Sequence, residues 1–197
     1  MFHFKLAATA MALLVLGSCY IPLRFDAEIA IVRDGTYTLT YNGTLTHAAL
    51  VPEFQSKPLT AAEAAERARG IQADLERDPA FKEVEFLGNG LFRIAYFTTG
   101  NIYETTSVTF VRTDSNILSI SYVRETGQIT VRGALIPEAQ KNMVIDAGLN
   151  SVGEIRVITD ARVLEHNATG VVPAEAGNEY VWIVRDINAQ PLLLIIG

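Results

Sequence analysis

Cysteine is nearly absent from this chain, because Cys19 is the only one among 197 residues. A single cysteine allows no internal disulfide, and it offers no pair of thiolates for a structural zinc site. Histidine is almost as scarce, with three in the chain, and no two of them have the spacing of metal ligands. The sequence therefore predicts no metal and no cofactor. A chain of this length buries enough apolar surface to fold without a disulfide bond.

Basic charge is also in short supply. The chain has 16 Lys and Arg against 22 Asp and Glu, for a net charge of −6. Nucleic acids and anionic lipid headgroups are both held by clusters of basic side chains. The acidic balance therefore predicts no nucleic-acid partner and no electrostatic adhesion to a membrane. After the first twenty residues, no apolar run approaches the roughly 20 residues that span a bilayer.

Motifs of catalysis are missing as well. The chain contains no G-x-S-x-G and no H-E-x-x-H. Glu83 and Glu85 alternate with apolar residues, which is typical of the solvated face of one strand rather than of a carboxylate pair across a cleft. Gly88-Asn89-Gly90 lacks the Lys and Ser/Thr that complete a phosphate loop. The sequence predicts that the protein is not an enzyme.

What the chain does have is a distinctive first segment. Lys5 precedes an almost wholly apolar run of 11 residues, Leu6–Leu16, which is too short to span a bilayer and typical of a signal peptide. The next residues complete Leu16-Gly17-Ser18-Cys19, which resembles the lipobox of bacterial lipoproteins. That resemblance implies cleavage before Cys19 and attachment of acyl chains to it. Two or more acyl chains hold a protein stably in a membrane.

Two other interpretations of this segment are an ordinary signal peptide with an incidental cysteine and a short uncleaved anchor. Under the lipobox interpretation, residues 1–18 are a lipoprotein signal peptide, 19–24 a short lipid-anchored tether and 25–197 a single domain. Cleavage leaves 15 basic and 22 acidic residues, a charge of 15 − 22 = −7. Because the tether is short, we expect the domain to lie close to the bilayer.

Tyr20 bears on the localisation, since it replaces the aspartate that retains many lipoproteins in the inner membrane. We expect the periplasmic face of the outer membrane in a Gram-negative host and the extracytoplasmic face of the plasma membrane otherwise. Either location belongs to the cell envelope.

Strand patterns dominate the rest of the chain. Residues 25–50 alternate between apolar and polar positions on both sides of Asp34-Gly35, a turn that favours a hairpin. Residues 81–100 predict a second hairpin around Gly88-Asn89-Gly90, and residues 107–135 predict a meander of three strands. Three more strand-like runs follow toward the C-terminus.

Two segments have helical patterns. In residues 59–79, Thr60 and Glu63 predict a capping box ahead of an alanine-rich apolar stripe, and Pro79 ends the helix. Residues 137–148 predict a shorter helix. A loop with two prolines is expected before the first helix. The predicted fold class is α+β, with a mainly antiparallel, curved β-sheet of about eight to ten strands and one or two helices packed on it.

The C-terminal part carries a family resemblance. A strand and turn lead to Val163-Leu164-Glu165-His166-Asn167, a loop with Gly and Pro follows, and a strand containing Trp182 closes the unit. With the lipobox and the N-terminal hairpin, this arrangement resembles the LppM-type domain of bacterial lipoproteins. The match rests on Asn167 and Trp182, and the membrane helix that often follows the domain in that family is not found here. The resemblance implies an α+β envelope domain linked to lipid or glycolipid handling, with no established enzyme activity.

Two functions remain open on the sequence. The first is a non-catalytic, lipid-anchored binding protein of the cell envelope that handles a lipid or glycolipid. Its candidate pocket residues are the aromatic residues Tyr37, Tyr41, Tyr96, Phe110 and Trp182. The alternative for these residues is that they fill the core. The second function is a protein-interaction or assembly factor of an envelope complex, which docks an envelope protein on a strand edge or apolar patch.

Overall fold

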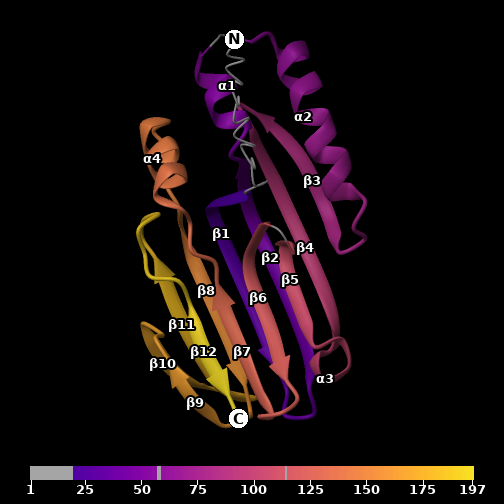
Figure 1. The fold of residues 1–197 in the computed structure, drawn as a ribbon, viewed down its shortest axis with the longest axis vertical. Helices are drawn as coiled ribbons and strands as arrows, with labels where there is room; N and C mark the ends of the chain where they lie inside the picture. Colours follow the sequence, from indigo (N-terminus) through magenta and orange to yellow (C-terminus); the bar gives the residue numbers. More distant parts are fainter. Residues whose placement is uncertain (1–19, 57–58, 114) are drawn as a thin grey trace, which may run out of the picture.

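The computed structural model describes residues 20–56, 59–113 and 115–197 (Figure 1). It is an α+β fold, as the sequence predicts, with twelve strands and four helices among these residues. The predicted signal peptide, residues 1–18, and Cys19 lie outside the described residues. Within the described part, no helix is both long and apolar enough to cross a membrane.

The strands form two sheets, where the sequence predicts one. Seven strands form the large sheet, in the order β10-β11-β8-β1-β2-β4-β3, and five form the small sheet, in the order β5-β6-β7-β12-β9. The strands are β1 (Tyr20–Ile31), β2 (Thr36–His47), β3 (Phe81–Gly88), β4 (Leu91–Asn101), β5 (Ser107–Arg112), β6 (Ser115–Val123), β7 (Gln128–Gly133), β8 (Val152–Thr159), β9 (Val163–His166), β10 (Gly170–Ala174), β11 (Gly177–Val184) and β12 (Leu193–Ile196).

A single helical turn moves the chain from one sheet to the other. It is α3 (Ile102–Thr105), capped at its start by Asn101, whose side chain accepts a hydrogen bond from the backbone N–H of Tyr103 at 2.9 Å. Thr106 ends the turn in the left-handed region at φ 60°. The chain therefore leaves β4 and enters β5 in a new direction, which the alternation of apolar residues alone does not reveal.

Both predicted hairpins and the predicted meander are present. β1 and β2 pair antiparallel around Asp34-Gly35, and Gly35 has the positive φ of 88° that such a turn requires. β3 pairs with β4, and β5, β6 and β7 follow one another in the small sheet. Strand β8 adds a parallel pair with β1, from Arg24↔Val152 to Ile31↔Thr159. That pairing joins segments more than a hundred residues apart.

The structure corrects the predicted tether. Residues 20–24 are the first part of β1, so they belong to the folded domain. Tyr20 pairs with His47 of β2, and the side chains of Ile21 and Leu23 are buried. Ile21 and Leu23 belong to a small apolar cluster that includes Val144. Burial of these apolar side chains stabilises the strand, although the short peptide looks like a linker in the sequence.

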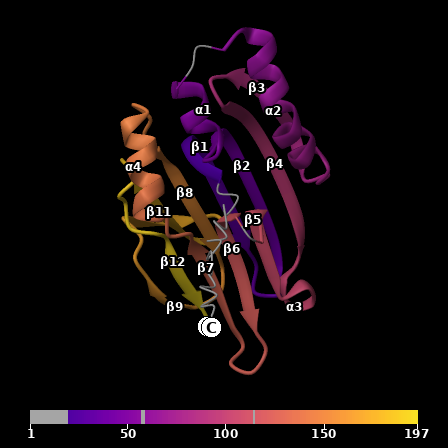
Figure 2. The same cartoon turned by 45° about the horizontal axis from the view of Figure 1, so that its top comes forward.

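The two predicted helices are present, and the structure adds a third before them. α2 (Ala61–Glu76) has the capping box of Thr60 and Glu63, and α4 (Glu138–Asp146) follows Pro137. Instead of the expected loop, the residues around Pro52 form α1 (Leu50–Ser56), where Pro52 lies in the first turn and its missing N–H costs no helical hydrogen bond. Pro58 lies outside the described residues. Figure 2 shows α1, α2 and α4 above the small sheet, which covers the lower part of the large one.

The main core lies between the two sheets. The large sheet contributes alternate residues of β1, among them Ala27 and Ile29, and the small sheet contributes Leu118, Ile120 and Leu194. Successive residues of a strand face opposite sides, so the intervening residues of β1 lie on the outer face of the large sheet. The side of α2 that carries Ala68 and Leu75 joins the same core near β3.

Candidate functional site

The structure places the five aromatic candidates in the core. Tyr37, Tyr41, Tyr96, Phe110 and Trp182 are all buried, with exposed fractions of 5% or less. The ring of Phe110 lies 4.4 Å from that of Tyr41 and 4.8 Å from that of Tyr96, measured between centroids. Their burial corrects the interpretation of these five residues as a pocket lining, and around Phe110 neighbouring rings occupy the space a ligand would need.

Burial also changes the acidity of two tyrosines. Loss of hydration raises the pKa of Tyr41 well above its ordinary value. For Tyr96, burial, assisted by the nearby charges of Asp78 and Tyr37, raises the pKa to about 12. Both phenols therefore stay protonated at neutral pH, which suits a structural role better than proton transfer.

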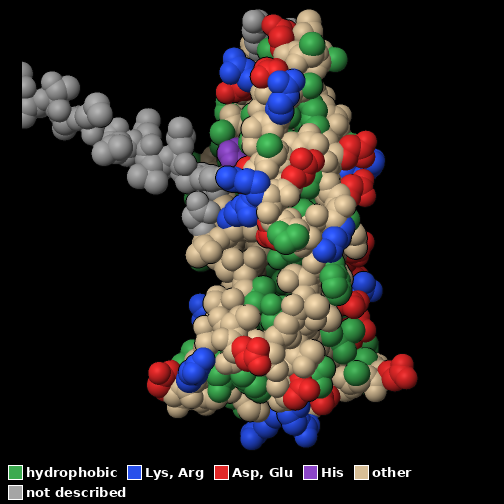
Figure 3. Space-filling view, turned by 90° about the vertical axis from the view of Figure 1, so that its right-hand side faces the viewer, with side chains coloured by type: hydrophobic (Ala, Val, Ile, Leu, Met, Phe, Trp, Pro, Cys, Tyr) green, Lys and Arg blue, Asp and Glu red, His purple; other side chains and the backbone are tan. Residues whose placement is uncertain are grey.

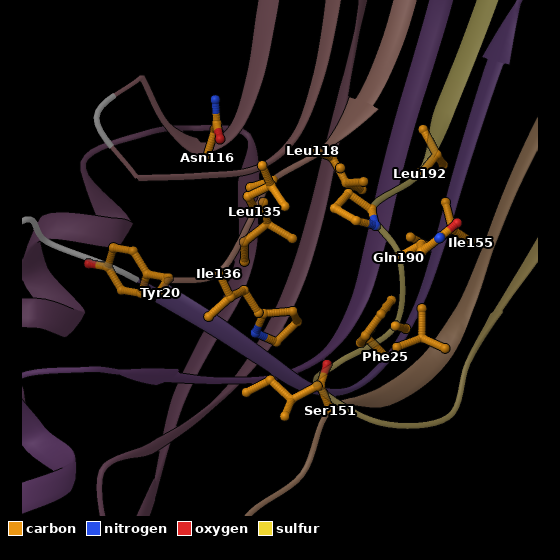
Figure 4. Close-up of a pocket in the computed structure, with 18 of the residues that line it drawn as sticks. Tyr20, Phe25, Asn116, Leu118, Leu135, Ile136, Ser151, Ile155, Gln190 and Leu192 are labelled. Carbon is orange, nitrogen blue, oxygen red and sulfur yellow. The ribbon is translucent and has the colours of Figure 1, made fainter. Parts of the chain in front are cut away.

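A pocket lies elsewhere, where the two sheets separate near the start of β1. We call it the inter-sheet pocket. Its interior volume is about 100 Å³. Figure 4 shows Tyr20 at one end, Phe25 and Ile155 at the other, and Leu135 and Ile136 between them. The lining is Tyr20, Pro22, Phe25, Ser115, Asn116, Ile117, Leu118, Gly133, Ala134, Leu135, Ile136, Pro137, Gln140, Ser151, Ile155, Val184, Asp186, Ile187, Ala189, Gln190, Pro191 and Leu192.

The chemistry of this lining is mostly apolar. Side chains of Phe25, Leu118 and Ile155 come from three different strands of the two sheets. Polar groups are a minority, and the single charged side chain is Asp186, whose carboxylate accepts a hydrogen bond from the backbone N–H of Asn188 at 2.8 Å. Such a surface favours an apolar ligand, oriented by a few polar groups.

Backbone hydrogen bonds fix the segments around the pocket. The N–H of Tyr20 donates to Oγ of Ser115 at 2.9 Å, which joins the start of the large sheet to the start of β6. The N–H of Ala134 donates to the carbonyl of Ile117 at 2.9 Å. The N–H of Gly133 donates to the carbonyl of Leu192 at the same distance. The pocket walls are therefore built on the sheet framework.

His47 packs beside Tyr20, the first residue of β1. Its ring meets the ring of Tyr20 edge to face, with centroids 4.9 Å apart. Partial burial lowers the pKa of His47 from its ordinary value, which favours the neutral imidazole. The neutral ring is the form that accepts the hydrogen bond from the backbone N–H of Ala49 to Nδ1, at 3.3 Å.

Asn167 and Trp182, the two residues behind the family resemblance, are joined directly. Nε1 of Trp182 donates to Oδ1 of Asn167 at 2.7 Å, and the backbone N–H of Leu193 donates to the same oxygen at 2.8 Å. Nδ2 of Asn167 donates to the carbonyl of Pro191 at 2.9 Å. Since Trp182 belongs to the large sheet and Leu193 to the small one, this amide links the two sheets close to the pocket wall.

The described residues hold no group of three His, Cys, Asp or Glu side chains placed to bind a metal ion. On the outer face of the large sheet, Arg156 lies 3.5 Å from Glu28 and 3.8 Å from Glu154, measured between charged atoms. Figure 3 shows acidic and basic side chains mixed over one side of the molecule. Exposed pairs of this kind contribute little to stability.

Sequence reasoning misses the inter-sheet pocket because five separated segments build it. One signal points toward it: Ala134-Leu135-Ile136-Pro137 is an apolar run that follows a strand but lacks a strand's alternation. In the structure these residues belong to neither a helix nor a strand. An apolar segment outside regular structure is a reason to look for a binding surface.

No family model and no curated protein matches this chain. Among solved structures, the chain is similar to the folded domain of LppM from Mycobacterium tuberculosis, determined by NMR. The TM-score is 0.44 and the identity is 12%, over 90% of this chain and 91% of that one. At this low similarity, the function is inferred from this chain's own residues.

Proposed function

We propose that this protein is a lipid-anchored, non-catalytic protein of the cell envelope that binds an acyl chain of a lipid in the inter-sheet pocket. The observation that carries the proposal is the position of this apolar pocket at Tyr20, the residue that directly follows the lipobox cysteine. The anchor would bring the pocket to the membrane surface, where acyl chains are abundant. The resemblance of residues 16–19 to a lipobox supports the anchor.

The shape of the pocket narrows the ligand class. An interior of about 100 Å³ with an open mouth suits part of one acyl chain rather than a whole lipid. The amides of Asn116, Gln140 and Gln190 belong to the lining and are suited to a polar headgroup or glycan near the mouth. Burial of methylene groups would supply the affinity, at about 0.8 kcal/mol for each.

The first test is mass spectrometry under mild conditions. The chain from Tyr20 to Gly197, which contains every described element, is exported in its native host and purified from the envelope compartment. We expect a lipid or glycolipid to be bound in stoichiometric amount. A mass without ligand, unchanged after envelope lipids are added, would contradict the proposed lipid binding.

A matched pair of variants ties binding to the pocket. Ala134→Phe places a ring in the pocket, and Ala62→Phe places the same ring on the exposed side of α2. We expect Ala134→Phe to weaken binding of a dansyl-labelled fatty acid at least ten-fold and Ala62→Phe to leave it unchanged. Equal affinities for both variants would show that the fatty acid binds elsewhere.

A second candidate function is the docking of an envelope protein. It is favoured by the edge strands β9 and β10, where Leu164, Val171 and Val172 are 44–47% exposed. An edge strand offers unpaired backbone groups to a partner. Cross-linking in the native envelope tests this function, and it becomes the leading one when no lipid is found.

A further inference from the structure

Leu135 is unusually exposed for a large apolar side chain. Its exposed fraction is 81%, whereas the other exposed large apolar residues of the described chain reach at most 48%. It belongs to the run Ala134–Pro137, which we call the mouth loop because all four residues line the inter-sheet pocket. The loop carries no charged side chain.

The ends of the mouth loop are held firmly. The backbone N–H of Ala134 donates to the carbonyl of Ile117 at 2.9 Å. At the other end, the carbonyl of Pro137 accepts from the N–H groups of Gln140 and Lys141 at 2.9 and 3.0 Å, in the first turn of α4. Leu135 and Ile136 therefore lie between two fixed points. The loop is already ordered, so a partner that contacts Leu135 does not have to offset the conformational entropy of ordering it.

The first described residue, Tyr20, lies at the same pocket. Tyr20 lines the end of the pocket beside Leu135 and Ile136 and is fixed by its hydrogen bond to Ser115. One residue of extended chain spans at most about 3.6 Å, so acyl chains on Cys19 would enter the bilayer directly beside the pocket. Acyl chains at that position would hold the bilayer surface against the mouth loop.

From these observations we infer that the mouth loop inserts Leu135 into the membrane, so that the inter-sheet pocket opens onto the hydrocarbon of the bilayer. The partner is a lipid surface, chosen because the chain enters the domain at this mouth and because the loop is apolar and uncharged. The inference rests on the proposed function, since it takes Cys19 as acylated. An acyl chain then passes from the bilayer to Phe25 and Ile155 without crossing water.

The single cysteine gives a clean experiment. In the mature lipoprotein the sulfur of Cys19 is a thioether and does not react, so Leu135→Cys provides one reactive thiol. This variant is labelled with the environment-sensitive dye NBD and reconstituted in vesicles of phosphatidylethanolamine and phosphatidylglycerol. We expect the emission to shift to shorter wavelength and to be quenched by lipids brominated on their acyl chains.

Val123→Cys is the matched control. Val123 is 43% exposed and pairs with Gln128 at the far end of β7, five residues along the strand from Gly133. At about 3.3 Å per residue, this end lies roughly 17 Å from the mouth loop. A label there is expected to emit as it does in water and to escape quenching.

Each outcome separates the inference from the function on which it rests. A label at position 135 that stays in water, on protein that remains with the vesicles, would overturn membrane insertion and leave the anchor intact. Equal quenching at both positions would overturn the proposed orientation. Protein whose Cys19 thiol reacts and which does not remain with vesicles would overturn the anchor, and the inference with it.

Discussion

The space between the two sheets is filled in one region and open in another. The ring centroids of Tyr41, Tyr96 and Phe81 lie within 6.1 Å of the centroid of Phe110. These rings leave no room for a ligand. Near Tyr20 the same two sheets are bordered by loops, and a pocket remains. Aromatic residues on facing strands therefore close the core, while segments outside regular structure leave it open.

The contrast also separates stability from binding. Core residues are covered on all sides, so truncating one leaves a cavity that its neighbours fill only in part. Residues of the mouth loop are already in contact with solvent, so their loss removes little. The same sandwich can therefore be stable in one region and available to a ligand in the other.

The largest expected effect comes from opening the filled region. Phe110→Ala removes a fully buried ring from between Tyr41 and Tyr96, and we expect it to lower the free energy of unfolding by about 3–5 kcal/mol. Urea denaturation followed by circular dichroism measures the change. A loss below about 1 kcal/mol would mean that this region is not the packed core described here.

A smaller effect is expected where the two sheets are linked by Asn167. Asn167→Ala leaves Nε1 of Trp182 and the N–H of Leu193 without their acceptor, and we expect a loss of about 1–3 kcal/mol. The environment of the single tryptophan reports the change in near-ultraviolet circular dichroism. Asn188→Ala, at an exposed position, is the control and should leave both the spectrum and the stability unaltered.

Alkaline pH should lower the stability of the protein through the buried tyrosines of the filled region. The native state holds the pKa of Tyr96 at about 12, whereas tyrosine in an unfolded chain titrates near 10. As the pH rises from 10 to 12, the unfolded chain ionises first, so stability that is fully present below pH 10 is lost across this window. Urea midpoints measured from pH 9 to 12 should fall less steeply for Tyr96→Phe. If the urea midpoints of both proteins fell equally steeply with pH, ionisation of Tyr96 would not be the cause of the lost stability.

The smallest effect is expected at the open region. Leu135→Ala removes a side chain that is 81% exposed, so we expect the free energy of unfolding to change by no more than about 0.5 kcal/mol. Thermal unfolding of the detergent-free domain from Tyr20 onward measures it. A loss as large as that of a core residue would place Leu135 inside the packed structure and remove the contrast between the two regions.

Local patterns made much of the fold predictable. The Asp34-Gly35 turn, the Thr60–Glu63 capping box and the meander of residues 107–135 all depend on residues close in sequence, and all are present. The division into two sheets was not predictable, because the change of direction at α3 depends on only four helical residues. The strand formed by residues 20–24 was missed because its apolar side chains are covered by distant segments such as α4.

The candidate site was less predictable than the fold. Aromatic residues in strands suit a core and a ligand pocket equally well by composition, and only their mutual contacts assign Tyr41 and Phe110 to the core. The inter-sheet pocket combines the start of β1 with loops more than a hundred residues away. No spacing rule along the chain brings such segments together.

By itself, the sequence determined the α+β class and the principal hairpins and helices, because turns, caps and side-chain alternation act over a few residues. It also carries the lipobox pattern at Cys19, on which the proposed anchor depends. Only the tertiary structure decided which apolar residues fill the core and which border a pocket. That choice depends on how two sheets approach each other, and their separation at each point is set by contacts between residues far apart in the chain.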